Sequence, residues 1–286
     1  MSGSPGEQGQ GAHAQGMSLA CEAVSFSYRE AGAAIRALRT VSFSVAAGGS
    51  VALLGASGAG KSTLLQLIRG LDEPEAGAVL LDGAGPGAPG YEAARRQTGL
   101  VFQTPELQLF AASAREDVAF GPRHLGWSDA QVDAAVEEAL ELVDLPPARF
   151  ADRHPYALSG GEQRRLALAG VLAMRPRLLL LDEPFVSLDP RTRRELVTVL
   201  ARLKAGGVTL ILATHDIDLA WALCDELVVL SEGEVVAAGA WDFGPSGGLT
   251  PSGRLREPFY VQLWRRLGRD PAAAPRTAGE AAEALA

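Results

Sequence analysis

The chain has 286 residues with a formal net charge of −8, and 47% of its residues are hydrophobic. This length can bury the core of one large or two small domains, and the composition excludes collagen-like, disordered and disulfide-rich chains as descriptions of the whole sequence. The negative net charge and the lack of a cluster of lysine and arginine residues argue against a nucleic-acid partner. The longest uncharged apolar run, residues 166–174, is far shorter than the roughly 20 residues of a membrane-spanning helix.

Residues 1–17 are rich in glycine, glutamine and serine and lack an apolar run, which predicts a disordered tail and no signal peptide. Met17 is an alternative first residue. Residues 41–45 (VSFSV) alternate apolar and polar side chains, and residues 23–28 (AVSFSY) match them, so a small antiparallel sheet opens the folded part. Cys21 and Cys224 lie in apolar segments and fit buried thiols of a reducing compartment.

Three later segments are continuous apolar runs, the pattern of strands that helices cover on both faces of a mostly parallel sheet. They are VALLG (51–55), LLLLD (178–182) and VTLILATH (208–215). Amphipathic helices are expected over 62–71 and 193–207, the second ending at a glycine pair. The predicted fold class is therefore α/β.

The segment from about 104 to 160 interrupts this alternation. Residues 128–145 begin with a capping box of Ser128 and Gln131 and carry apolar residues on one helical face, which predicts a helical insert. Residues 226–239 predict a closing β-hairpin that turns at Glu232 and Gly233.

Residues 244–270 form a C-terminal extension, in which residues 254–268 predict either a dimer-stabilising helix or an amphipathic cap. Residues 271–286, rich in alanine and proline, predict a second disordered tail.

The sequence GASGAGKS (55–62) matches G-x-x-x-x-G-K-[ST] between a buried strand and an amphipathic helix, the context of a phosphate-binding loop. Glycines let backbone N–H groups close on phosphates, the helix N-terminus adds its positive dipole, and Lys61 reaches the β and γ oxygens. Ser62 is the expected Mg²⁺ ligand. The residues predicted to bind nucleotide here are Gly55, Ala56, Ser57, Gly58, Ala59, Gly60, Lys61, Ser62 and Thr63.

Two further segments carry candidate chemistry. Asp182 and Glu183 end an apolar strand, where parallel sheets bind ligands, and we expect Asp182 to hold Mg²⁺ and Glu183 to polarise an attacking water. LSGGE (158–162) places Ser159 and backbone N–H groups at the start of a helix, a second anion site. Alone, Asp182 and Glu183 fit an acidic turn better, but the phosphate loop upstream favours the site. Alone, LSGGE fits an ordinary serine cap better, and only the order of all the motifs favours a site there.

The order of the motifs resembles that of the ATP-binding cassette (ABC) ATPases over residues 19–239. The series is the phosphate loop, Gln103 in VFQ, LSGGE, LLLLDE, Asp189 in SLD and His215 after a strand. The resemblance implies a P-loop NTPase core with a RecA-like sheet, an N-terminal antiparallel β subdomain and a helical subdomain, all within residues 18–243. It also implies ATP and Mg²⁺ as cofactors and a head-to-tail dimer of cassettes.

Individual roles follow from the same resemblance. In the dimer, Ser159, Gly160 and Gly161 of one cassette complete the ATP site of the other. The resemblance also implies that Glu183 is the catalytic carboxylate and that His215 contacts the γ-phosphate. It implies that Gln103 binds Mg²⁺ and the water, beside the metal ligands Ser62 and Asp182. Asp189 is then the cross-interface residue, and Tyr28 is the aromatic residue that stacks on adenine.

Segments 101–110, 116–127 and 169–176 are similar to the ATP-binding subunits of energy-coupling factor (ECF) transporters, the cobalt, nickel and vitamin importers. This implies a peripheral protein on the cytoplasmic face of the cell membrane that drives uptake of a small micronutrient. Its implied partners are a second cassette, identical or different, a transmembrane coupling subunit and a substrate-binding membrane subunit. The alternatives are another ABC importer family and a soluble, non-transport ABC ATPase.

Thr104, Glu162 and the pair Phe185 and Val186 depart from the usual residues of the family, which leaves the type of ECF cassette open. The apolar residues that follow Gln103 predict either a groove for a helix of a membrane partner or the core of the insert itself. They are Leu107, Leu109, Phe110, Phe120 and Trp127.

Overall fold

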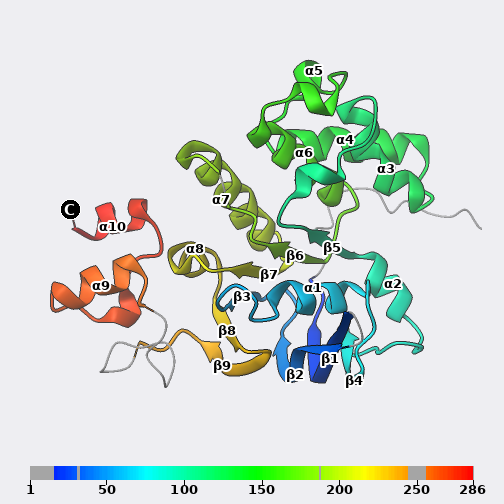
Figure 1. Ribbon diagram of the computed structural model, residues 1–286. Helices are drawn as coiled ribbons and strands as arrows, with labels where there is room; N and C mark the ends of the chain where they lie inside the picture. Colours follow the sequence, from blue (N-terminus) through cyan, green and yellow to red (C-terminus); the bar gives the residue numbers. More distant parts are fainter. Residues whose placement is uncertain (1–15, 31–32, 187, 244–255, 286) are drawn as a thin grey trace, which may run out of the picture.

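The computed structural model describes residues 16–30, 33–186, 188–243 and 256–285. Within them, one sheet has the strand order β5-β6-β7-β3-β8-β9 (Figure 1). Its first five strands are parallel and the last is antiparallel. The strands are β3 (Ser50–Leu54), β5 (Thr98–Val101), β6 (Leu178–Asp182), β7 (Thr209–Thr214), β8 (Glu226–Ser231) and β9 (Glu234–Ala240). The α/β prediction and the hairpin at Glu232 and Gly233 are confirmed.

The apolar runs of the sequence become the centre of this sheet because both of its faces are covered. Successive strand residues point to opposite faces, so Val51 and Leu53 belong to one hydrophobic core, and Ala52 and Leu54 belong to the other. The first core lies against α1 (Lys61–Arg69) and α2 (Tyr91–Arg96), and the second against α6 (Gly160–Leu172), α7 (Pro190–Ala205) and α8 (Ile217–Leu223). Helices on both faces explain why these strands carry no polar alternation.

The smaller sheet has the antiparallel order β2-β1-β4, as expected for the N-terminal part. Its strands are β1 (Leu19–Glu30), β2 (Ala33–Val45) and β4 (Ala76–Leu81). Leu19, Val24 and Val41 pack into the same core as α1. This contact fixes the small sheet against the start of α1, where the phosphate loop lies.

The helical insert occupies the chain between β5 and β6, and α3 to α6 form a lobe on the other side of the large sheet from β1, β2 and β4 (Figure 1). Its elements are η1 (Pro105–Gln108), α3 (Ala114–His124), α4 (Asp129–Leu142), α5 (Pro147–Phe150) and η2 (Pro155–Ala157), followed by α6. The capping box of Ser128 and Gln131 is present at the start of α4, as predicted.

Both chain ends differ from the expected disorder within the described residues. Met17 is fully buried, and its backbone N–H donates to Thr209 Oγ1 over 3.0 Å. Residues 271–285 form η3 (Pro271–Ala273) and α10 (Ala278–Leu285), next to α9 (Phe259–Arg266). The prediction of a disordered tail over 271–286 is wrong there, because polar contacts to α8, such as the indole N–H of Trp221 donating to Pro275 O, replace the missing bulky apolar residues.

Outside the described residues lie the remaining parts of the predicted tails, residues 1–15 and 286. The same is true of residues 244–255 of the extension. Cys21 and Cys224 are buried free thiols, as expected, and burial raises the pKa of each to about 12. No helix in the described part of the chain is both long and apolar enough to cross a membrane.

Candidate active site

The phosphate loop joins the end of β3 to the start of α1. Gly60, the N-cap of α1, has a φ of 101°, and a Cβ there would lie 2.8 Å from Ala37 O, so only glycine fits. No side chain caps the helix, and no acidic residue lies in its first turn. The first N–H groups of α1 therefore face the loop with the positive end of the helix dipole, an arrangement that binds anions.

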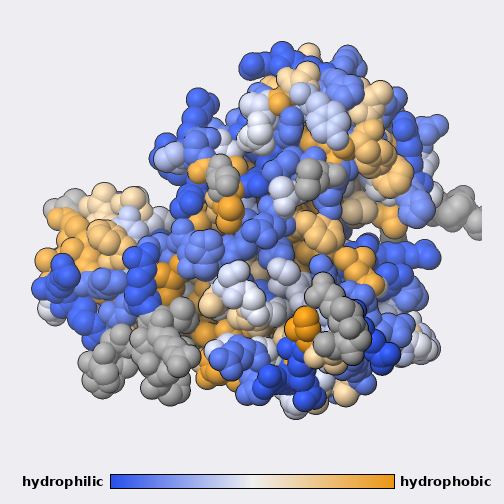
Figure 2. All heavy atoms as spheres, in the orientation of Figure 1, coloured by the Kyte–Doolittle hydropathy of each residue, from blue (hydrophilic) through white to orange (hydrophobic). Residues whose placement is uncertain are grey.

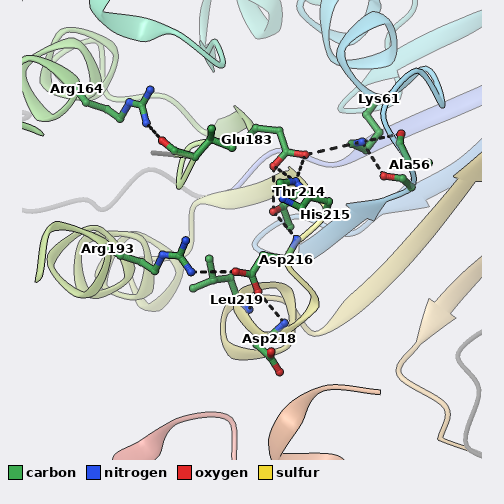
Figure 3. A network of polar contacts seen from close by, with 12 residues as sticks. Ala56, Lys61, Arg164, Glu183, Arg193, Thr214, His215, Asp216, Asp218 and Leu219 are labelled. Carbon is green, nitrogen blue, oxygen red and sulfur yellow. Dashed lines mark hydrogen bonds and ion pairs between the residues drawn. The ribbon is translucent and has the colours of Figure 1, made fainter. Parts of the chain in front are cut away.

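Lys61 is 8% exposed and lies across this loop. Its Nζ donates to Gly55 O over 2.8 Å and to Ala56 O over 3.1 Å, and it lies 3.9 Å from Glu183 Oε1 (Figure 3). The ammonium group thus connects the phosphate loop with the end of β6.

Glu183 and His215 meet because they follow adjacent parallel strands, β6 and β7, in which Asp182 is opposite Ala213. His215 Nδ1 lies 3.0 Å from both carboxylate oxygens of Glu183 (Figure 3). The Thr214 hydroxyl donates to Glu183 Oε2 over 3.3 Å. Glu183 has a φ of 46°, a left-handed conformation that is unfavourable for a side chain with a Cβ and is concentrated at functional sites.

Asp182 is 6% exposed, and its Oδ1 is buried without a hydrogen-bond partner. Burial raises the pKa of this carboxyl, the Ser62 hydroxyl and Lys61 oppose the shift, and Glu183 adds to it. An unpartnered buried oxygen beside the phosphate loop fits a ligand of a hard cation such as Mg²⁺. In the described part of the chain, no three His, Cys, Asp or Glu side chains cluster as a metal site.

Tyr28 and Gln103 flank this centre. Tyr28 is 40% exposed, and its hydroxyl lies 3.1 Å from Thr63 Oγ1 and donates to Gln66 Oε1 over 3.2 Å, which places the ring beside the first turns of α1. Gln103 follows β5, the neighbour of β6, and its side chain is exposed.

Ser159 and Asp189 lie together in a second place, an open cavity of about 570 Å³ that Gly161 also lines. Ser159 caps α6 in a capping box, where its backbone N–H and its hydroxyl both donate to Glu162 Oε2 over 2.8 Å. These bonds lower the pKa of Glu162. Asp189 caps α7, and the Thr192 hydroxyl, 2.6 Å from Asp189 Oδ2, lowers the pKa of the aspartate. The predicted site residues thus form two separate groups within one chain.

Comparison with known proteins fits this geometry. The ABC transporter family profile matches residues 38–186. The chain is 43% identical to the cobalt import ATP-binding protein CbiO of Rhodobacter capsulatus over 263 residues, which cover 91% of this chain and 92% of the relative. The chain belongs to the ABC transporter family.

Other relatives of this ABC protein agree. It is 43% identical to the ECF transporter ATP-binding protein EcfA2 of Symbiobacterium thermophilum, covering 79% of this chain and 80% of the relative. Among solved structures, cbiO1 of Clostridium perfringens, a part of the cbiONQ transporter complex, has a TM-score of 0.68 and 34% identity over 78% of this chain and 88% of that chain.

The cassette MJ0796, solved as a dimer bound to ADP and phosphate, has a TM-score of 0.70 and 31% identity over 78% of this chain and 98% of that chain. The protein is an ATPase subunit of an ABC importer of the ECF and CbiO type.

Sequence reasoning missed one residue that holds this ABC cassette together, Arg164 of α6. The residue is 8% exposed, and its guanidinium donates to Val186 O (Figure 3), to Gln103 O over 3.2 Å and to Glu106 over 3.4 Å. It therefore joins the segment after β5, the segment after β6 and the helix that Ser159 caps. No local pattern signals this, because all the partners are distant in the sequence.

Proposed function

We propose that this chain hydrolyses MgATP between two cassettes and thereby drives uptake of a small micronutrient, a metal ion or a vitamin, through membrane subunits. The observation that carries the proposal is the cluster of Lys61, Glu183 and His215 at the ends of three neighbouring parallel strands. Such a cluster combines charge neutralisation, a base and a phosphate contact, which phosphoryl transfer to water requires.

In the proposed reaction, the N–H groups at the start of α1 and Lys61 hold the β- and γ-phosphates. Glu183 orients a water for attack on the γ-phosphorus and takes its proton as the bond to the bridging oxygen breaks and ADP leaves. His215, 3.0 Å from Glu183, contacts the γ-phosphate and keeps the carboxylate in place with Thr214.

The magnesium ion supplies positive charge to the phosphate oxygens when it is bound. The unpartnered Oδ1 of Asp182 and the exposed hydroxyl of Ser62 support their assignment as its protein-side residues, with Gln103 at the side of the attacking water. Beside them, Tyr28 offers an exposed ring for the adenine.

Ser159, Gly160, Gly161 and Asp189 complete the ATP site of a partner cassette in this proposal. Ser159, Gly161 and Asp189 line one open cavity at the start of α6, which presents N–H groups to an anion. Since it is a separate place from the phosphate loop of the same chain, a head-to-tail pair is needed to bring the two together.

A groove beside the helical lobe supports docking of the transmembrane coupling subunit. This cavity has a volume of about 560 Å³, and Phe110 and Phe120 line it, 62% and 53% exposed, with their rings 4.9 Å apart edge to face. Leu109 also lines this groove, although it is only 2% exposed and belongs to the core of the lobe. Trp127 lines a neighbouring cavity. Figure 2 shows that apolar surface, drawn in orange, gathers on this lobe and again near α9.

Arg69, Arg95 and Arg96 also line the groove. Glu92 pairs with Arg95 over 2.8 Å, and the carboxylate of Asp117, another lining residue, accepts the backbone N–H groups of residues 110 and 111 over 2.9 Å. A partner helix with apolar side chains and a carboxylate fits this surface. Docking there makes the chain a peripheral protein at the cytoplasmic face, and the proposed assembly adds a substrate-binding membrane subunit.

The variant Glu183→Gln tests the catalytic assignment. It should retain ATP binding and favour the closed dimer while lowering turnover by at least about 10²-fold, the scale for the loss of one preorganised catalytic group. Glu232→Gln is the matched control, because Glu232 has a similar φ of 51° in an exposed turn. Near-normal hydrolysis by Glu183→Gln would reject the role of this carboxylate.

The variant Phe110→Asp tests the docking groove in vesicles that contain the membrane subunits. Transport should fall at least about tenfold more than basal ATP hydrolysis, because a charge replaces a central apolar contact. Val236→Asp on β9, where Val236 is 43% exposed, is the control for a new surface charge. Equal losses of transport and hydrolysis in Phe110→Asp would contradict the docking proposal.

A further inference from the structure

The short helix α8 begins two residues after His215, so its position determines where the imidazole lies. It has seven residues, and an isolated helix of this length is not stable in water. Asp216 caps it by accepting the N–H groups of Asp218 and Leu219, and Arg193 of α7 donates to Asp216 Oδ2 over 3.0 Å (Figure 3). Contacts outside the helix must hold the rest of it.

The C-terminal segment, residues 256–285, contacts α8 at both ends. At the start of the helix, Asp218 Oδ1 accepts the backbone N–H of Phe259 over 2.5 Å, and Asp218 Oδ2 accepts Arg256 Nη2 over 3.2 Å. At its end, Arg276 Nη1 donates to Trp221 O over 2.9 Å and to Cys224 O over 2.6 Å. α9 and α10 accordingly lie next to α8 in Figure 1.

Arg276 is the main anchor among these contacts. The last carbonyls of a helix lack intrahelical partners and carry the negative end of the dipole, so a guanidinium donating to two of them is favourable. The same guanidinium lies over the Trp221 ring, 4.2 Å from its centroid, while the indole N–H donates to Pro275 O over 3.0 Å. Trp221 is 4% exposed and the Arg276 side chain 32%, so the ring of this contact is buried while the cation is partly exposed.

We propose that Arg276 is a positioning residue for ATP hydrolysis, which holds α8 and through it the His215 imidazole against Glu183. This inference rests on the role proposed for His215. A helix that loses its C-terminal anchor can shift, and a displacement of about 1 Å at a reacting group costs up to about 10²-fold in rate.

The test compares Arg276→Met with Arg269→Met in the full-length chain, in the assembly in which it is isolated. Arg269 is the matched control, because its contacts lie within the C-terminal segment and not on α8: it is 5.3 Å from the Trp264 ring centroid and donates to Ala284 O over 2.9 Å. Arg276→Met should lower kcat about tenfold with the KM for ATP changed by less than about twofold, the pattern of a loss at the chemical step. Arg269→Met should change both constants by less than about twofold.

A second measurement separates positioning from a general effect on folding. In a His215→Ala background, Arg276→Met should lower the residual single-turnover rate by less than about twofold, because the two residues act as a unit. An unchanged kcat of Arg276→Met, or the same loss in both backgrounds, overturns the positioning role. Normal turnover by His215→Ala instead refutes the proposed role of the histidine, so the two failures are distinguishable.

If Arg276→Met does not fold, Trp221→Phe decides. This variant removes the N–H that donates to Pro275 O and keeps the aromatic ring. A loss of about threefold in kcat that disappears in the His215→Ala background supports the proposal, and an unchanged kcat overturns it.

Discussion

Replacing Arg164 with methionine should destabilise the cassette far more than the loss of an ordinary surface arginine. Arg164 is 8% exposed, and its guanidinium donates to Val186 O, to Gln103 O and to Glu106. Methionine fills a similar length but donates no hydrogen bond, so two backbone carbonyls and one carboxylate lose a partner.

The size of the effect follows from these contacts. A hydrogen bond to a charged group contributes about 1.5–3 kcal/mol, and removing one member of a buried ion pair costs about 3–5 kcal/mol. Because the Glu106 side chain is 28% exposed, water can rehydrate it, and the total falls at the low end, about 3 kcal/mol.

Urea unfolding followed by circular dichroism measures this loss. With an m-value of about 3 kcal/mol/M, the midpoint of Arg164→Met should fall by about 1 M. Arg115→Met is the control, because Arg115 also bridges two helices through Asp133 and Glu137 but its partners are 64% and 62% exposed, which limits its contribution to about 1 kcal/mol or less. If both variants shift the midpoint equally, the buried guanidinium does not hold the three segments together.

Two further predictions concern the nucleotide site. Burial raises the pKa of Asp182 above its value in the unfolded chain, so the ionised carboxylate opposes folding at neutral pH. Asp182→Asn should therefore unfold at a higher urea concentration than the parent at pH 7, and this gain in stability should disappear as the pH falls toward the ordinary pKa of about 3.9. The same variant should bind ATP more weakly in the presence of Mg²⁺. A gain that is independent of pH would contradict this reasoning. Tyr28→Ala should weaken ATP binding about tenfold in an equilibrium titration, the scale of one base stacked on an aromatic ring. Tyr28→Phe loses only the hydrogen bonds to Thr63 and Gln66 and should bind ATP normally. Equal weakening by both variants would show that the hydroxyl contributes to binding and the ring does not.

Local sequence patterns predicted the parts of the structure that local physics determines. The apolar runs became β3, β6 and β7 because a strand covered on both faces has no polar side. The box of Ser128 and Gln131 formed as predicted because its bonds span only three residues. The starts of α1 and α6 could be predicted since each depends on a turn and a cap within a few residues.

Contacts between distant segments could not be predicted in this way. In the sequence, nothing distinguishes Arg164 from the other polar residues of α6, and only the fold brings it into contact with Gln103 and Val186. Likewise, the alanine-rich end of the chain was predicted to be disordered from its lack of bulky residues, yet Arg276 and Pro275 bind it to Trp221. The composition of a segment indicates how much apolar surface it can bury, but it does not show which of its polar groups form hydrogen bonds with the rest of the fold.

The position of β3 in the sheet has a consequence for the synthesis of the protein. This strand leads directly into the phosphate loop, but its two neighbours, β7 (Thr209–Thr214) and β8 (Glu226–Ser231), come more than 150 residues later. At a translation rate of about 5–20 residues per second, the ribosome makes this stretch in about 8–35 s. Throughout that interval, the apolar strand has no sheet to join and the loop has no rigid support. A nascent chain therefore completes the sheet around β3, and with it the support of the phosphate loop, only near the end of translation.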